Sequence, residues 1–420
     1  MKTLLICFFL SSASASLAQG PGSAGALFLL IQPSLRANGM AGASVASVET
    51  DAIGIAFNPA RLGVAALNNY FAAEFYPSQI QWLPQLAPDI RYDARTVLFG
   101  CNFKRLGKSI PISLGIGYTR ILIDLGAQII TGEIDPTPIG TFHSTERAGV
   151  WTFGVGVDYV VKAGFGWSFK HIESNLAPRF SDNQKVDGKA KASAHDLGFV
   201  AHLLIDEIIA RWAKTSFEIR PGLRPSLGLG LGYSQSNIGK EIVYIDASQA
   251  DPLPRIARAG LSLNAGLAFS REKQTWRIFS FERLNEAEQL LVRSDRGRNV
   301  RYAKFLGDID IWDNVFLGKG GSSIITHRGW ELRFFEIFSL RRGHHEDALG
   351  RVYYDAEGIG LSLIGTLKAS RYLSPQLGDS ALLYFLVNHL DIQYNSSSLD
   401  AGAGHPLDKT KFKGISVRFF

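Results

Sequence analysis

The chain has 420 residues, of which 46% are hydrophobic, 20% charged and 11% aromatic, with a formal net charge of +6 at pH 7. Two cysteines among 420 residues exclude a disulfide framework, whereas 43 glycines and many aromatics favour short strands and tight turns. Beyond residue 18 no apolar run reaches 18 residues, which excludes a membrane-spanning helix. The basic residues are spread along the chain, so we expect no nucleic-acid partner.

Residues 1–18 have the pattern of a signal peptide. Lys2 supplies a positive charge, residues 4–10 (LLICFFL) are apolar, and Ser16 and Ala18 place small residues at a cleavage site. The alternative is a short buried helix at the N-terminus. We expect an exported chain that begins at Gln19.

The next segment, residues 19–66, is rich in small residues and precedes the first predicted strand. Asn58-Pro59 predicts a turn, because proline lacks a donor and restricts the residue before it. Such a segment could fill the interior of a larger β structure as a plug. The alternative is that the turn only begins the first strand.

From about residue 67 to residue 420 the chain alternates apolar residues with glycine or polar residues, the pattern of β-strands. The apolar sets include Ile112, Leu114, Ile116 and Tyr118; Trp151, Phe153, Val155, Val157 and Tyr159; Ala163, Phe165, Trp167 and Phe169; Leu197, Phe199, Ala201, Leu203 and Ile205; Leu227, Leu229, Leu231 and Tyr233; and Ala259, Leu261, Leu263, Ala265 and Leu267.

These strands predict an all-β fold, an antiparallel transmembrane barrel of about 14 strands. Aromatics at the ends of the apolar face are typical of a membrane interface, and glycine on the other face indicates a crowded interior. A sheet can cross lipid only as a closed barrel, because lipid leaves no partner for free backbone groups. A soluble β-sandwich is the alternative; its polar face would carry more Lys, Glu and Thr.

The pattern predicts that short and long connections alternate along the barrel. Residues 160–162 and 335–337 predict tight links, and residues 175–191, 235–254 and 285–323 predict long polar ones. Long connections are typical of extracellular loops and short ones of periplasmic turns.

The chain ends in an alternating strand, Gly414 to Phe420, which closes on Phe419 and Phe420. This ending resembles the signal that the barrel insertion machinery recognises in outer-membrane barrels, and we expect that machinery to be a partner. The apolar parity runs through Ile415, Val417 and Phe419, so the signal is offset by one residue.

The segment that precedes the barrel resembles a known family. Arg36-Ala37-Asn38-Gly39-Met40-Ala41-Gly42-Ala43, Asp51-Ala52 and Phe57-Asn58-Pro59-Ala60 look like the N-terminal signature of the FadL-like transporters and the PorV/PorQ outer-membrane proteins. Ala41 replaces a glycine of that signature. Later stretches that resemble PorV are His327 to Arg333, Phe338 to Asp347, Pro254 to Leu261 and Gly358 to Leu361.

The resemblance implies a FadL-like barrel with Arg36, Gly39, Gly42, Asp51, Asn58 and Pro59 in a plug and turn motif. It also implies a function at the outer membrane in type IX secretion or cell-surface assembly, with lipid, secreted cargo and secretion-system subunits as partners. The alternative is a FadL-like channel for uptake of hydrophobic small molecules.

We expect no enzyme, no cofactor and no metal. His344 to Asp347 contain potential metal ligands, but neighbours on a strand point to opposite faces and rarely converge on one ion. No serine nucleophile elbow or zinc-helix motif occurs. An active site assembled from distant residues of a barrel enzyme is the remaining alternative.

Overall fold

The computed structural model describes residues 24–47, 49, 51–68, 70–107, 110–131, 137–176, 179–181, 184–186, 188–213, 218–244, 250–271, 274–294, 300–373 and 380–420. The predicted signal peptide, residues 1–18, lies outside the described residues. Within the described ranges, no helix combines the length and the apolar character of a membrane span.

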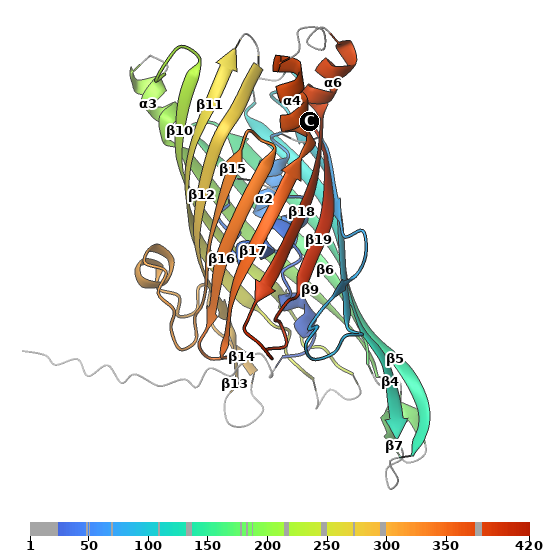
Figure 1. Cartoon of the computed structure of the whole chain (residues 1–420). Helices are drawn as coiled ribbons and strands as arrows, with labels where there is room; N and C mark the ends of the chain where they lie inside the picture. Colours follow the sequence, from blue (N-terminus) through green and yellow to red (C-terminus); the bar gives the residue numbers. More distant parts are fainter. Residues whose placement is uncertain are drawn as a thin grey trace, which may run out of the picture.

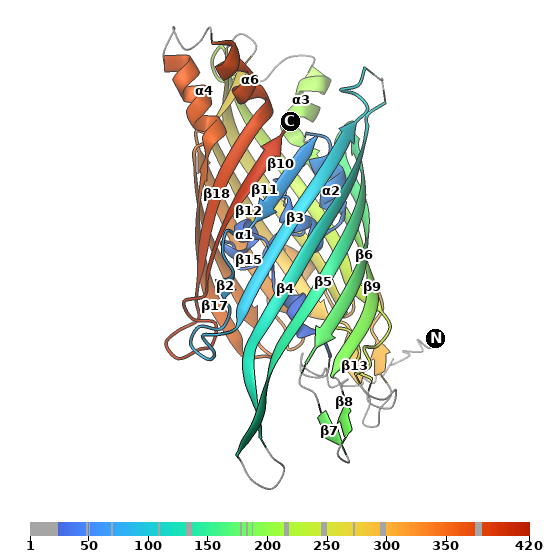
Figure 2. The ribbon, with the colours of Figure 1, turned by 90° about the vertical axis from the view of Figure 1, so that its right-hand side faces the viewer.

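Fourteen antiparallel strands form a closed barrel, which confirms the predicted fold class (Figures 1 and 2). The ring closes at β1, which pairs with β19 on one side and with β3 on the other. The short β2, Ile80–Gln81, pairs only with β3. The ring consists of β1 Phe71–Phe75, β3 Arg91–Asn102, β4 Ile112–Thr131, β5 Pro138–Asp158, β6 Val161–Asn175, β9 Lys189–Leu204, β10 Leu223–Gly239, β11 Ile256–Arg271, β12 Gln274–Leu290, β15 Ile325–Phe334, β16 Phe338–Asp347, β17 Val352–Ser362, β18 Leu390–Asp400 and β19 Lys411–Phe419.

The predicted apolar parity faces outward, as expected for a barrel in lipid. Phe153 is 43% exposed, whereas its neighbour Thr152 is fully buried and its hydroxyl is 2.9 Å from that of Ser168 on the next strand. The same alternation holds on other strands. Exposed outward residues include Leu114, Ile116, Tyr118, Trp151, Val155, Phe165, Trp167, Leu197, Leu227, Leu231 and Leu263.

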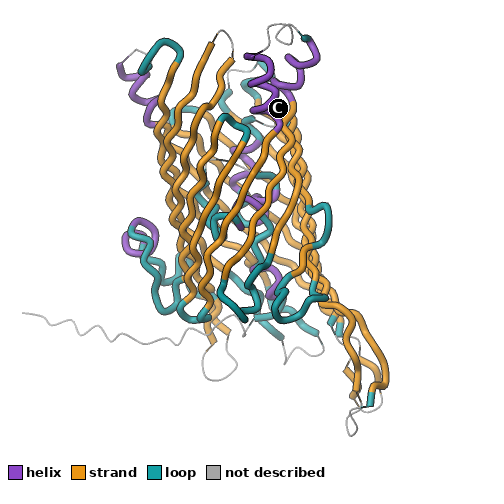
Figure 3. The backbone as a smooth tube through the Cα atoms, viewed as in Figure 1, coloured by secondary structure: helices purple, strands orange, loops and turns teal. Residues whose placement is uncertain are grey.

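The two ends of the barrel differ (Figure 3). The end that carries the C-terminus has tight links, such as residues 159–160 and 335–337, and three helices, α3 Ile205–Ala213, α4 Leu363–Leu373 and α6 Ala381–His389. The opposite end carries longer connections, which contain two hairpins and one helix. The first hairpin is formed by β7 Arg179–Ser181 and β8 Gln184–Val186, the second by β13 Val292–Ser294 and β14 Val300–Tyr302, and the helix is η5 Ile311–Phe316. By the general rule for such barrels, the C-terminal end is therefore the periplasmic end.

Several strands are longer than the sequence pattern predicts. β10 continues to Gly239 and β12 to Leu290, inside segments predicted as polar connections, and Val161 and Lys162 begin β6 rather than forming a link. Beyond the lipid both faces of a strand contact water or loops. The apolar alternation is therefore lost there although the backbone pairing continues.

The described residues between 24 and 66, which we call the plug, lie inside the barrel (Figures 1 and 2). The plug contains four short helical turns, η2 Leu27–Leu30, α1 Leu35–Asn38, η3 Ile53–Ala56 and α2 Ala60–Ala65. Its residues are almost all buried, including Met40, Ile53 and Leu62. The chain thus fills its own lumen before it forms the first strand.

Inward-facing glycines of the wall make room for the plug backbone. A Cβ atom on Gly166 would overlap the backbone of Pro59, and one on Gly232 would overlap the carbonyl of Val45. These glycines explain why one face of the alternating pattern lacks side chains.

We predict that the two faces respond differently to a charge. Phe153→Arg should cost about 2–4 kcal/mol because it places a guanidinium in lipid. Ser226→Arg should cost less than about 1 kcal/mol, because Ser226 lines an open part of the lumen. Urea unfolding in lipid vesicles measures both. A larger cost for Ser226→Arg than for Phe153→Arg would show that the inward and outward faces are misassigned. Thr152 is unsuitable as the lumen control, since the fully buried site has no room for arginine.

Candidate functional site: the plugged lumen

The plug is held to the wall by a buried arginine. Arg36 of α1 forms ion pairs with Glu282 of β12 and Glu331 of β15, the latter at 2.9 Å, and donates a 2.7 Å hydrogen bond to the Ser47 hydroxyl. Arg341 of β16 also contacts Glu331, at 2.5 Å. All of these side chains are buried. One plug residue therefore joins two strands through buried charges, and Glu331 links this pair of strands to Arg341 of a third.

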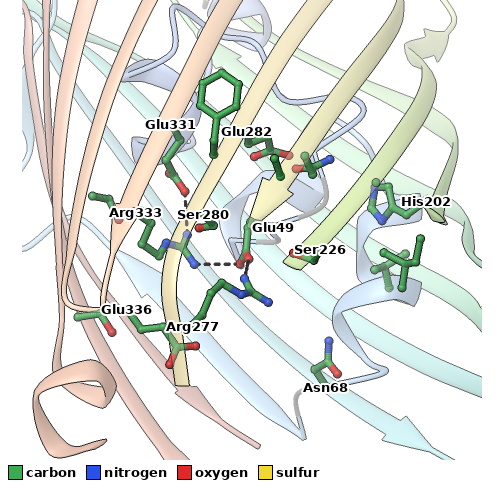
Figure 4. Close-up of a pocket in the computed structure, with 18 of the residues that line it drawn as sticks. Glu49, Asn68, His202, Ser226, Arg277, Ser280, Glu282, Glu331, Arg333 and Glu336 are labelled. Atoms are coloured by element: carbon green, nitrogen blue, oxygen red, sulfur yellow. Dashed lines mark hydrogen bonds and ion pairs between the residues drawn. The ribbon is translucent and has the colours of Figure 1, made fainter. Parts of the chain in front are cut away.

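A second ion pair network borders the open part of the lumen. Glu49 of the plug contacts Arg277 at 2.6 Å and Arg333 at 3.2 Å, as Figure 4 shows. Arg333 also reaches Glu331 at 2.8 Å, which connects this network to Arg36. Arg333 and Arg277 hold the pKa of Glu49 well below its usual range. Glu49 thus stays ionised where an ordinary glutamate would already be protonated.

Asp51 organises the plug from within. Its carboxylate accepts a hydrogen bond from the Ser34 hydroxyl and pairs with Arg61 at 2.6 Å. Arg61 is only 1% exposed, and it also donates to the carbonyl of Glu49 at 2.8 Å. This pair ties α2 to the segment that carries the ion pairs of the wall.

Asn58 connects two parts of the plug to the wall. Its amide donates to the carbonyl of Val45 at 2.9 Å and to that of Phe199 on β9 at 3.3 Å, while its oxygen accepts from the N–H of Ala60 at 3.1 Å. Pro59 follows with φ −62° and leads into α2. The Asn58-Pro59 pair therefore precedes a helix inside the lumen and not the first strand.

Gly39 and Gly42 allow the close approach of the plug to the wall. Gly42 has a φ of +92°, and a Cβ atom there would lie 2.9 Å from Nδ1 of His327. A Cβ atom on Gly39 would lie 3.1 Å from the Cα of Gly358. His327 Nδ1 is 2.8 Å from the carbonyl oxygen of Ala41, which places a wall side chain on the plug backbone.

The structure thus brings Arg36, Gly39, Gly42, Asp51, Asn58 and Pro59 together in the lumen. Phe419 and Phe420 lie elsewhere, at the end of β19, where Phe419 is partly exposed and the N–H of Phe420 donates to the carbonyl of His389 at 3.0 Å. Their role in assembly stays a prediction. Sequence reasoning did not single out the partners Glu282, Glu331 and Arg341. The signal that could have identified them is a charged residue at an inward-facing position of a predicted strand.

A polar cavity of about 540 Å³ lies between the plug and the C-terminal end (Figure 4). Charged and polar groups from the plug, from several strands and from α3 line it, among them Glu49, Lys162, His202, Arg277, Arg333 and Asp391. Apolar side chains, among them Leu203, Leu204 and Ile364, line the rest of the cavity.

On the other side of the plug the lumen contains a large apolar cluster. Phe28, Leu29 and Ile31 of the plug pack there against inward-facing wall residues. These wall residues are Tyr76, Tyr92, Ile121, Ile123, Val150, Ile172, Ile256 and Phe412. Barrel interiors are usually polar, so this apolar compartment, as we call it, is a distinctive feature of the lumen.

The wall beside the apolar compartment has an interrupted seam. β1 ends at Phe75 opposite Ile415, and the remaining residues of β19 toward Lys411 pair only with β18. A second pocket of about 210 Å³ lies at this seam, lined by Ser78, Gln79, Ile80, Gln81, Pro84, Lys409, Lys411 and Lys413. On the lumen side Trp82 packs edge-on against Phe412 at 6.2 Å between ring centroids. The seam therefore lies directly beside the apolar compartment.

No model of a known protein family matches the chain, and neither does any curated protein sequence. Solved structures with a similar overall path include the toluene transporters TbuX of Ralstonia pickettii and TodX of Pseudomonas putida, each 10% identical. The match to TbuX has a TM-score of 0.35 and covers 93% of this chain and 98% of that one; for TodX the values are 0.37, 91% and 96%. A FadL homologue of Pseudomonas aeruginosa is 8% identical, with a TM-score of 0.34 and coverage of 92% and 96%. Scores this low transfer no function.

Among the residues that the structure describes, no group of three or more His, Cys, Asp or Glu side chains is placed to hold a metal ion. His344 bonds Asp355 at 2.8 Å on the outer face, whereas His345 stacks on Tyr354 at 4.5 Å between ring centroids. The two adjacent histidines have separate surroundings.

We predict that Arg36 is essential for attachment of the plug. Arg36→Ala leaves Glu282 and Glu331 without this partner, which should cost about 3–5 kcal/mol of plug attachment. Hydrogen exchange should become faster in residues 34–47 while the strands stay protected. Adding Glu282→Gln should restore part of the protection, since it removes an uncompensated charge. Unchanged exchange in Arg36→Ala would show that the ion pairs do not hold the plug.

We also predict that Asn58 and Pro59 fix the route of the plug without being needed for the barrel. Asn58→Ala removes three hydrogen bonds and should loosen the plug by about 1–3 kcal/mol, so leak of small solutes should rise. Asn58→Asp keeps the acceptor for Ala60 but loses both donors, and should give most of the same leak. Pro59→Ala should act more weakly. Liposome swelling measures the leak, and loss of the heat-modifiable folded band on gels would instead assign the pair to barrel assembly.

Proposed function

We propose that this chain is an outer-membrane channel that admits a hydrophobic small molecule. The apolar compartment carries the proposal. Tyr92, Ile172 and Phe412 turn apolar side chains into a lumen that in a polar-solute pore would be hydrated. The plug segment around Phe28 and Leu29 now fills this space, and a solute of similar chemistry could replace it at little cost in burial.

The proposed path leaves the lumen sideways. Beyond the plug a solute would meet the buried ion pairs of Arg36 with Glu282 and Glu331, and breaking such pairs is costly. The seam between β2 and β19 offers another route, because no backbone hydrogen bonds of a paired strand need to break there. The plug would then block polar leakage while the solute passes toward the lipid.

TbuX and TodX are toluene transporters, and toluene belongs to the class of solute that we propose here. This agreement is a motive for choosing monoaromatic hydrocarbons among the first test solutes. The proposal itself depends on the lumen and the seam of this chain.

A second candidate function, favoured by the PorV/PorQ resemblance, is the binding of secreted cargo or secretion-system subunits. The β4–β5 hairpin projects past the barrel end (Figure 1). β3 pairs with β4 only to Asp124, and β6 pairs with β5 only to Thr145, so both edges of the tip have no strand partner among the described residues. Ile129 in this tip is 63% exposed. Free edges can pair with a strand of another chain. Recovery of secreted proteins with the wild type, but not after deletion of residues 127–142, would favour this candidate.

We predict that closing the seam stops passage of the solute. In a variant that combines Cys101→Ser, Gln79→Cys and Lys411→Cys, a short reducible crosslinker should join the two new thiols across the seam. Uptake of toluene by intact cells should then fall several-fold. Reductant should restore it. A matched control, Ala73→Cys with Val417→Cys, bridges residues that already lie opposite each other in the β1–β19 ladder, so its crosslink should not affect uptake. Full crosslinking at the seam with unchanged uptake would exclude the lateral route.

A further inference from the structure

We propose that the outer wall of the barrel carries a binding site for the phosphate of an outer-leaflet glycolipid. The site consists of Arg283 on β12, Arg328 and Trp330 on β15 and Arg342 on β16; we call it the arginine patch. It does not depend on the channel function proposed above.

Strand register places these side chains together on the outward face. Arg283, Trp330 and Arg342 lie directly opposite one another across three neighbouring strands. Arg328 is two residues from Trp330 and therefore points to the same side. Neighbouring strands are about 4.8 Å apart, so Arg283 and Arg342 flank the indole at roughly 10 Å from each other. The two long side chains can therefore reach a single phosphate group from either side of the indole.

The charges of the arginine patch are only partly compensated by protein. Arg328 pairs with Glu346 at 3.3 Å. Among the described residues, Arg283 and Arg342 have no ion pair or hydrogen bond, although Glu357 lies opposite Arg342 in the β16–β17 ladder. Paired arginines do occur elsewhere on the outer wall: Arg95 contacts Asp93 at 3.1 Å, and Arg147 contacts Glu173. The arginine patch therefore retains positive charge that an anion can neutralise.

The surroundings of the patch indicate a membrane interface. Residues that lie further toward the periplasmic end on the same strands are apolar, with Phe281, Leu332 and Leu340 opposite one another. Charged residues at such depth usually direct their ends toward the headgroups, and an indole beside them is typical of the interfacial belt. A phosphate at the boundary between apolar and polar wall lies within the reach of these long side chains.

A loop packed on the outside of the barrel forms the flank of the site. The amide of Asn285, next to Arg328 in the ladder, donates to the carbonyl of Phe316 at 3.3 Å, and Phe305 stacks on Tyr233 at 4.3 Å. These contacts hold η5 against the wall. Trp312, stacked on Phe316, is nevertheless 65% exposed. Exposed aromatics held at this level would insert into lipid beside the phosphate that the arginines bind.

The chemistry favours a lipid phosphate over a protein partner. Guanidinium groups bind phosphate through two parallel hydrogen bonds and stay charged near lipid. In the strand register the patch lies on the side of Phe281, Leu332 and Leu340 that is further from the C-terminal end. That side is the outer one by the rule for such barrels, so the leaflet that the patch meets is the outer one. The ligand class is accordingly a glycolipid that carries phosphate on its sugar headgroup.

The test measures lipid A bound to the purified full-length barrel by native mass spectrometry in detergent. Wild-type protein should bind lipid A, and binding to the dephosphorylated lipid should be at least about tenfold weaker, the factor expected for loss of a charge-assisted hydrogen bond. Arg283→Gln with Arg342→Gln should lower binding of lipid A by a similar factor. Replacing both by lysine should restore part of it, because the charge returns without the paired donors.

The control is Arg95→Gln with Arg147→Gln, which removes two outward arginines that already have carboxylate partners. This variant should bind lipid A like the wild type, and a heat-modifiable band should show that both variants fold. If both variants lost lipid A binding equally, the binding would depend only on the total positive charge of the barrel and the site would be wrong. Equal binding of lipid A and of the dephosphorylated lipid would also overturn the site. If the wild type were a dimer that dissociated only in the double variant Arg283→Gln and Arg342→Gln, and lipid binding did not change, the patch would be a contact between two copies of the chain and not a lipid site.

Discussion

Every feature of this structure depends on one constraint, that backbone hydrogen-bonding groups surrounded by lipid must be paired within the protein. The constraint closes fourteen strands into a ring through β1, which pairs with β3 and β19 although it is only five residues long. The seam is the exception. β1 ends at Phe75, and the residues of β19 toward Lys411 pair only with β18 while β2 pairs only with β3.

Closure of the ring creates a lumen that must itself be filled, and the plug does this in two chemically different ways. Around α1 the plug meets the wall through ions, with Arg36 shared by Glu282 and Glu331. On either side of these ion pairs it meets the wall through apolar side chains, such as Phe28 in the apolar compartment and Leu62 of α2 against Leu98. Buried ion pairs need defined partners and hold one position, whereas apolar contacts tolerate exchange of one partner for another.

The outer surface has a corresponding division. On β3 to β9 the lipid-facing band is broad and aromatic, as with Trp151, Phe153 and Trp167. On β12 to β16 it is interrupted by the arginine patch and covered by the loop that carries η5. Outward arginines also occur on β3 and β5, but Arg95 and Arg147 are paired there with carboxylates. The two sides therefore differ in how the outward charge is compensated.

The sequence by itself determined the fold class and the outward parity, because a strand in lipid must be apolar on one face and every strand repeats this constraint. It also pointed to residues 34–63 as special, through Gly39, Gly42 and the Asn58-Pro59 pair. It did not reveal that Asn58 bonds Phe199, that Arg36 joins Glu282 to Glu331, or that β10 and β12 extend beyond the lipid. These facts join residues far apart in the chain or lie where lipid no longer imposes a pattern. Only the tertiary structure decides them, since a buried charge is satisfied by whichever partner the closed ring brings within reach.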